Sequence, residues 1–151
     1  MISLLDVNLL IALAWPNHIH HAPARRWFRE SRESGWATCP VTQSGFVRVS
    51  SNRSALPDAK SPHEAVLLLR RIVALPGHVF WNDDVALASS EEIEPSRLQC
   101  HGQVTDAHLL ALAMRRHGCL ATFDEGIRQL VPGGRSREEL VRIVPAALDR
   151  R

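Results

Sequence analysis

Two short apolar runs in this sequence each end at an aspartate. Residues 1–5 lead directly into Asp6, and residues 119–123 lead into Asp124. Each run has the length and apolar character of a strand that is buried on both faces. The carboxyl ends of parallel strands lie at one edge of a sheet, where α/β proteins bind their ligands. The two runs therefore predict an α/β fold with two carboxylates at the same edge.

Strand-like and helical segments alternate along the rest of the chain. The predicted strands cover residues 1–5, 36–39, 78–81, 119–123 and 140–144. The predicted helices cover residues 7–14, 21–34, 41–51, 66–75, 85–92 and 103–117. Ser61 and Glu64 have the spacing of a capping box and are expected to open the fourth of these helices. This alternation is typical of an α/β domain with a mainly parallel sheet, and we expect residues 1–151 to form a single domain.

Composition narrows the class of protein further. No apolar run approaches the ~20 residues that span a bilayer, and the apolar start meets Asp6 too early for a signal peptide. Cys39, Cys100 and Cys119 are odd in number and lack metal-site spacing, so we expect all three to be small core residues. These features favour a cytoplasmic protein with no membrane association. The net charge of +2 is too small to indicate a nucleic-acid partner.

A third aspartate, Asp106, lies near the start of the strongest predicted helix, residues 103–117. A right-handed connection places the start of that helix on the same side of the sheet as the strand ends. Taken singly, Asp6 and Asp106 also fit helix caps, and Asp124 fits the start of a turn. Gathered together, such carboxylates would repel by about 4 kcal/mol per close pair at an effective dielectric of 20. Protons or a hard divalent cation such as Mg²⁺ must then neutralise them.

Three segments of the sequence resemble motifs of the PIN-domain nucleases. Residues 4–10, Leu-Leu-Asp-Val-Asn-Leu-Leu, resemble the opening motif of that family. Residues 104–109, Val-Thr-Asp-Ala-His-Leu, resemble its third acidic motif, and residues 121–124, Ala-Thr-Phe-Asp, resemble the fourth. Within the family the chain is most similar to the VapC-type toxins of bacterial toxin–antitoxin pairs.

The resemblance implies a three-layer α/β/α sandwich and a Mg²⁺- or Mn²⁺-dependent endoribonuclease acting on tRNA, ribosomal RNA or mRNA. It makes Asp6, Asp106 and Asp124 the catalytic metal ligands, the last of them through water. Asn8 is then expected to orient Asp6, and Thr105 to support Asp106. The resemblance also implies a homodimer and a small antitoxin protein that inserts a segment, often bearing arginine, into the acidic groove.

One position departs from the family pattern. Many PIN domains carry a glutamate in the helix after the second strand, whereas this chain has Gln43. A glutamine offers a carbonyl oxygen without charge, which can coordinate weakly or accept a hydrogen bond from metal-bound water. Asp83, Asp84 and Glu125 are candidates to replace the missing charge, and Gln43→Glu is expected to tighten Mg²⁺ binding. Arg48, in the same helix, is the first candidate for contact with the substrate.

Two other interpretations are open. Gln43 gives some support to a PIN-like module that binds RNA or a partner with weak or no catalysis. A Mg²⁺-dependent phosphatase is the other, but its dehalogenase-type form requires a second aspartate where Asn8 stands. A receiver-type domain requires a lysine after a late strand, and the only lysine is Lys60. His108 lies near Asp106 on the same helix; we expect it at a solvated helix position, with an approach to the groove as the alternative.

Overall fold

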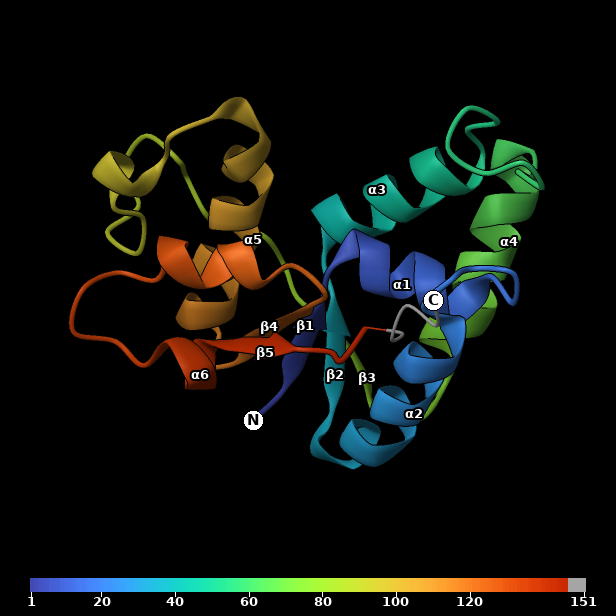
Figure 1. The fold of residues 1–151 in the computed structure, drawn as a ribbon, viewed down its shortest axis with the longest axis horizontal. Helices are drawn as coiled ribbons and strands as arrows, with labels where there is room; N and C mark the ends of the chain where they lie inside the picture. The colour runs from blue at the N-terminus through green and yellow to red at the C-terminus, as the bar shows by residue number, and fades with distance from the viewer. Residues whose placement is uncertain (147–151) are drawn as a thin grey trace, which may run out of the picture.

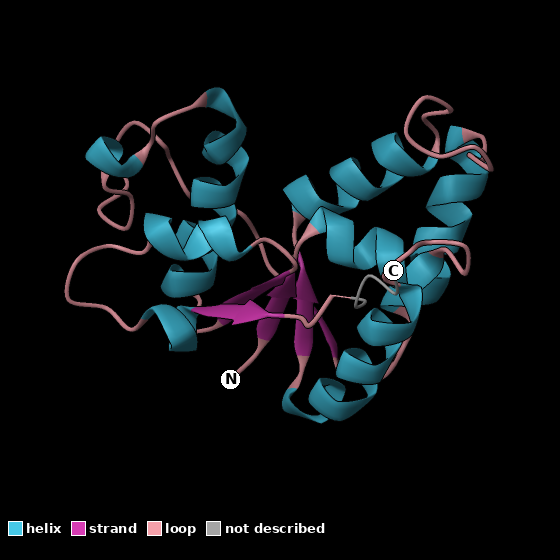
Figure 2. Cartoon of the chain, viewed as in Figure 1, coloured by secondary structure: helices cyan, strands magenta, loops and turns pink. Residues whose placement is uncertain are grey.

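A five-stranded sheet in which every pairing is parallel forms the centre of the molecule (Figures 1 and 2). The computed structural model describes residues 1–146. The strands are β1 (Ser3–Leu5), β2 (Trp36–Thr38), β3 (His78–Phe80), β4 (Cys119–Thr122) and β5 (Val141–Ile143), in the spatial order β3-β2-β1-β4-β5. The chain adds β2 and β3 on one side of β1, then returns to add β4 and β5 on the other. The strand order thus reverses between β1 and β4, where α/β sheets open a crevice.

The register of this central pair positions the two strand-end aspartates. Leu5 of β1 lies opposite Ala121 of β4, and the Asp6 backbone N–H donates to the Ala121 carbonyl oxygen at 3.0 Å. Asp6 therefore lies beside Thr122, and Thr122 precedes Asp124 by two positions in the sequence. The strand ends predicted from the two apolar runs are confirmed as neighbours.

Helices cover both faces of the sheet and make three layers. The helices are α1 (Val7–Ala14), α2 (His21–Ser31), α3 (Pro40–Ser50), α4 (Pro62–Val73), α5 (Val104–Arg115) and α6 (Arg137–Leu140). Helices α1 to α4 lie on one face, whereas α5 and α6 lie on the other (Figure 1). The structure confirms the α/β/α architecture, and the sheet is more regular than the mainly parallel one that we predicted.

Each strand contributes to a core on both faces, which explains the continuous apolar runs. Leu4 and Leu120 join the cluster beneath α5, while their neighbours Leu5 and Ala121 join the cluster beneath α1 and α2. All four are fully buried. Because both faces of such a strand are buried, its side chains are largely apolar and do not alternate between apolar and polar. A charged side chain therefore comes only at the end of the strand.

Local signals determine where two of the helices begin. The Ser61 hydroxyl accepts from the Glu64 N–H at 3.2 Å, and the Glu64 carboxylate accepts from the Ser61 N–H at 3.0 Å. This confirms the predicted capping box at the start of α4. Pro40 occupies the first turn of α3, where the lack of an N–H has no cost.

Some predicted boundaries are wrong. The helix predicted over residues 85–92 is absent: the segment forms turns and irregular backbone held by contacts of Arg115 with Asp84 and Glu92, and Leu87 remains exposed. The helix predicted over 21–34 ends at Ser31 and continues as one 3₁₀ turn, Arg32–Ser34. Cys39 and Cys119 are buried as predicted, but Cys100 is exposed in a loop. Within the described residues, no helix is long and apolar enough to cross a membrane.

Candidate active site

Asp6 is the most enclosed of the three aspartates. Its residue is only 8% exposed, and it caps the start of α1. One carboxylate oxygen, Oδ1, accepts from the Val7 N–H at 2.7 Å, and the other, Oδ2, accepts from the Thr122 hydroxyl at 2.8 Å. Burial raises the pKa of Asp6, and the charge of Asp124 raises it further, although both hydrogen bonds act in the opposite direction.

Thr122 is the site residue that we did not predict. It is fully buried at the end of β4, and its Oγ1 also accepts from the Asp124 N–H at 3.1 Å. One hydroxyl thus connects Asp6 with the turn that carries Asp124. Thr122 lies within the acidic motif at residues 121–124, so its position was visible. Its partner was not, because the contact joins residues 116 positions apart.

Asp106 lies in the first turn of α5, and α5 covers the opposite face of the sheet from α1 (Figure 1). Burial raises its pKa to about 6, with smaller contributions from the charges of Asp6 and Asp124. Among residues 1–146, no hydrogen bond or ion pair to its carboxylate is recorded. Asp106 is therefore a half-buried acid whose charged neighbours are other acids.

Asp124 occupies the open side of the site. It is exposed, and its Oδ1 accepts from the Gly126 N–H at 2.8 Å at the start of a 3₁₀ segment, Glu125–Leu130. This confirms that it starts a turn. The same residue contributes to the raised pKa of both Asp6 and Asp106, so its charge reaches both carboxylates.

The donor set fits a hard divalent cation that is only partly held by protein. Three mutually repelling carboxylates supply oxygen ligands, which Mg²⁺ prefers, and it commonly keeps several waters. In the described part of the chain, no three or more His, Cys, Asp or Glu side chains converge closely enough to hold an ion by themselves. The arrangement therefore suits an ion bound through one or two carboxylates and completed by water.

The two residues expected to assist the aspartates lie outside this contact network. Asn8 is exposed on α1, and no hydrogen bond between its side chain and Asp6 is recorded in the described residues. The groups that orient Asp6 are instead Thr122 and the Val7 N–H. Thr105 is also exposed, beside Asp106 at the start of α5.

Gln43 is attached to the fold by its amide nitrogen. That nitrogen donates to the hydroxyl of Thr38, the last residue of β2, at 3.0 Å. Gln43 lies in the first turn of α3 and is partly exposed. Arg48, one turn further along α3, is exposed and has no recorded ion pair among residues 1–146.

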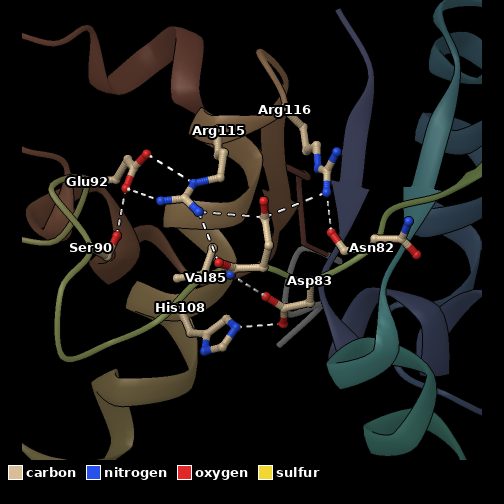
Figure 3. A network of polar contacts seen from close by, with 9 residues as sticks. Asn82, Asp83, Val85, Ser90, Glu92, His108, Arg115 and Arg116 are labelled. Atoms are coloured by element: carbon tan, nitrogen blue, oxygen red, sulfur yellow. Dashed lines mark hydrogen bonds and ion pairs between the residues drawn. The ribbon is translucent and has the colours of Figure 1, made fainter.

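The acids that we considered as substitutes for a glutamate at position 43 have other partners or act elsewhere. Asp83 accepts from His108 at 2.6 Å, so the side chain of His108 contacts the segment after β3 (Figure 3). Asp84 lies 3.7 Å from the Arg115 guanidinium and 3.6 Å from that of Arg116. None of the acids at positions 83, 84 and 125 contributes to the raised pKa of Asp6 or Asp106.

The contacts in Figure 3 fasten residues 82–92 to the far side of α5. The Arg115 side chain donates to the backbone carbonyl of Asp84 at 3.0 Å and to the Glu92 carboxylate at 3.3 Å. The Arg116 side chain donates to the carbonyl of Asn82 at 2.6 Å. Every acid in this group has a basic partner. Hence the group serves structure, in contrast to the aspartates at the strand ends.

The chain is similar to known proteins over most of its length. The PIN domain family matches residues 3–131. Ribonuclease VapC39 of Mycobacterium tuberculosis is 47% identical over 134 residues, which cover 89% of this chain and 96% of that protein. Ribonuclease VapC38 of the same organism is 50% identical over 125 residues, covering 83% and 86%. Ribonuclease VapC44 is 42% identical over 140 residues, covering 93% and 98%. With three aspartates at the crevice of a parallel sheet, this chain belongs to the PIN-domain family, among the VapC-type ribonucleases.

Proposed function

We propose that this protein is the endoribonuclease toxin of a toxin–antitoxin pair and that it requires Mg²⁺, or Mn²⁺ in its place. The observation that supports this most strongly is the placement of Asp6 and Asp124 at the ends of neighbouring strands, with Asp106 in the first turn of α5. Burial raises the pKa of Asp6 and Asp106, and the charges of the other acids raise it further. Such a site is unfavourable by itself and becomes favourable when it binds a cation. The family membership supports the choice of RNA as substrate.

Asp6 and Asp106 are the residues proposed to hold the ion, with Asp124 acting through water. When bound, Mg²⁺ lowers the pKa of a coordinated water and offsets charge on the phosphate. The Thr122 hydroxyl and the Val7 N–H hold the Asp6 carboxylate in one orientation. The N–H of Gly126 holds one oxygen of Asp124 and leaves the other available. These contacts position the acids before the substrate arrives, which reduces the reorganisation needed during phosphodiester hydrolysis.

Cleavage of total RNA tests the proposal. With Mg²⁺, the wild type is expected to cut a discrete set of tRNA, ribosomal or messenger species, and a chelator is expected to abolish cutting. Asp6→Asn should lower the rate by about 100-fold or more, because an amide cannot replace a charged ligand. Glu92→Gln is the matched control, since it neutralises an acid of the structural group, and it should cut within about threefold of wild type.

Two outcomes of this experiment would support other functions. A wild type that binds RNA but cuts none of these substrates would support the non-catalytic binding module. Hydrolysis of small phosphate esters without RNA cleavage would support the phosphatase, an alternative that the family match leaves without support.

The family resemblance implies an antitoxin segment, often bearing arginine, in the acidic groove, and we further propose that a second segment of the same partner docks in a pocket on the opposite face from α5. The pocket has a volume of about 280 Å³, and apolar side chains from α1, α2, α4 and β2 make most of its wall. Its lining residues are Leu13, Arg25, Phe28, Arg29, Arg32, Trp36, Ile72 and Leu75. The three arginines have no recorded ion pair within the described residues. An apolar segment bearing acidic residues would match both the wall and the charge of this pocket.

Co-expression with the small reading frames that flank the gene tests this partner. One product is expected to co-purify with the chain and to suppress RNA cleavage. Arg29→Glu should weaken the complex by about tenfold or more, whereas Arg137→Glu, at an exposed position of α6 on the other face of the sheet, should leave its affinity unchanged. Equal affinity of both variants would place the partner elsewhere.

A homodimer is the remaining part of the proposal. β3 is an edge strand, and its residues Val79 and Phe80 are 39% and 47% exposed. An exposed apolar edge strand can pair with a second copy. Light scattering is expected to give twice the chain mass, and Phe80→Asp should shift it to the monomer. A monomeric wild type would contradict this part alone.

A further inference from the structure

A chain of polar side chains links position 43 to the third strand. The Gln43 amide nitrogen donates to Thr38 Oγ1 at 3.0 Å, and the same Oγ1 lies 2.8 Å from Nε2 of His78. Thr38 is fully buried, and the His78 ring packs against the buried Trp36 ring in a tilted arrangement, with 4.7 Å between the ring centroids. The three residues come from α3, β2 and β3, so neither their order nor their contact follows from sequence proximity.

The number of protons in this chain restricts its arrangement. Thr38 has one hydroxyl proton, and its oxygen already accepts from Gln43. Thr38 is fully buried, and among residues 1–146 the one acceptor recorded for its hydroxyl proton is Nε2 of His78. Because a buried hydroxyl proton without an acceptor is unfavourable, we assign the proton to this contact, and the imidazole is then neutral and protonated at Nδ1. Burial lowers the pKa of His78, which favours that neutral form at pH 7.

Because the amide nitrogen of Gln43 donates to Thr38, the carbonyl oxygen is the end of the amide that can bind another group. With its nitrogen bound to Thr38, Gln43 has its carbonyl oxygen Oε1 without a recorded partner among residues 1–146. Gln43 lies at the edge where β1 and β2 end. α3 meets the start of α1 there, so closely that a Cβ on Gly45 would come within 2.6 Å of Val7 Cγ2. Val7 is the first residue of α1, and the residue before it is the helix cap Asp6.

We propose that Thr38 and His78 are positioning residues, which orient Gln43 so that its carbonyl oxygen is offered at the strand edge that carries Asp6. This assignment rests on the proposed function, because an acceptor at this edge serves to hold water on a cation. If Nε2 of His78 carried the proton instead, Thr38 would donate to position 43. The amide would then turn, and its nitrogen would face the edge, where a cation repels it.

A carboxylate at position 43 requires the hydrogen bonds of this chain to run in the opposite direction. A glutamate can only accept, so Thr38 must donate to it, and His78 must then donate from Nε2 to Thr38. Gln43→Glu therefore reverses the whole chain and moves the proton of His78 from Nδ1 to Nε2. The identity of residue 43 is thus readable at a histidine that it does not touch.

Long-range proton–nitrogen NMR of the imidazole groups tests this directly and needs neither metal nor RNA. At pH 7.5 the wild type is expected to show His78 unprotonated at Nε2, and Gln43→Glu is expected to show it protonated there. His78→Gln assigns the signals by removing them. A wild type protonated at Nε2, or identical patterns in the two proteins, would overturn the proposal.

Cleavage kinetics give the second readout. Thr38→Val should lower kcat by about tenfold with little change in KM, and Thr38→Ser should restore it. Ser50→Ala is the matched control, because Ser50 is also fully buried but its hydroxyl accepts from Trp15 Nε1 at 3.4 Å. Equal losses in Thr38→Val and Ser50→Ala would reduce Thr38 to a structural residue. Absence of cleavage by the wild type would instead refute the proposed function, and the NMR result would still decide the orientation of Gln43.

Discussion

Helix α5 lies beside two groups of acidic side chains, and only one of these groups has basic partners among the described residues. At its start, Asp106 joins Asp6 and the exposed Asp124, and the charges that raise the pKa of Asp6 and Asp106 are those of other acids. Along its far side, Arg115, Arg116 and His108 face Asp83, Asp84 and Glu92 (Figure 3). The first group lacks the basic partners that the second group has.

One acid from each group illustrates this contrast, because the pKa of Asp106 is raised and the pKa of Glu92 is lowered. Burial raises the pKa of Asp106 to about 6, whereas hydrogen bonds from Ser90 and Arg115 lower that of Glu92. An acid with a lowered pKa stabilises the fold as a carboxylate, and an acid with a raised pKa destabilises it. The ion pairs between α5 and residues 82–92 therefore stabilise the position of this helix, whereas Asp106, which has no basic partner among the described residues, is available to bind a cation.

The largest effect that separates the groups should appear in the stability of the metal-free protein. Asp106→Asn removes a carboxylate that its surroundings disfavour, so we expect the free energy of unfolding at pH 7.5 to rise by about 1–2 kcal/mol, after allowance for solvent screening. Glu92→Gln removes a favourable charge and should lower it by less than about 1 kcal/mol. Denaturant unfolding with a chelator present measures both. A loss of stability in Asp106→Asn would contradict the distinction.

The difference in unfolding free energy between Asp106→Asn and the wild type should also depend on pH. Between pH 6 and pH 4 folded Asp106 is largely protonated, whereas in the unfolded chain it is still largely ionised. The folded wild type therefore gains stability relative to Asp106→Asn as the pH falls through 6. We expect the advantage of the variant to shrink below pH 6.5 and to disappear near pH 4. Measuring the difference cancels the opposite effect of His18 and His78, whose lowered pKa values destabilise the fold as the pH falls.

The smallest expected effect concerns Gln43, which is uncharged and belongs to neither group of acids. Gln43→Glu adds a fourth carboxylate to the site, and we expect it to tighten Mg²⁺ binding by about threefold to tenfold. Calorimetric titration of both proteins measures the change. Unchanged or weaker binding would show that position 43 does not act on the ion.

Much of the fold follows from local sequence. The apolar runs ending at Asp6 and Asp124 predict the two central strands, because a strand covered on both faces must be apolar throughout. The capping box of Ser61 and Glu64 predicts the start of α4 for an equally local reason. The helix predicted over residues 85–92 fails because that segment is fixed by contacts to α5, such as Arg115 with Glu92, which lie 23 positions apart.

The candidate site divides in the same way. The three aspartates stand in motifs that are visible along the chain, and the register of β1 and β4 brings two of them together. Thr122 and the partners of Gln43 were not predicted, since their contacts depend on which strands are neighbours. Thr38 meets His78 only because β2 and β3 pair, with 40 positions between them.

Calorimetric titration of the metal-free wild type with Mg²⁺ at pH 6.5 tests the central claim most directly, when it is repeated in two buffers of different ionisation enthalpy. We predict binding of one or two ions with release of protons, because Asp106 and Asp6 have raised pKa values and must be ionised to bind. Asp6→Asn and Asp106→Asn should each lose most of this binding, and Glu92→Gln should keep it. Absence of binding, or equal binding by all four proteins, would contradict the claim that the strand-end aspartates form a metal site.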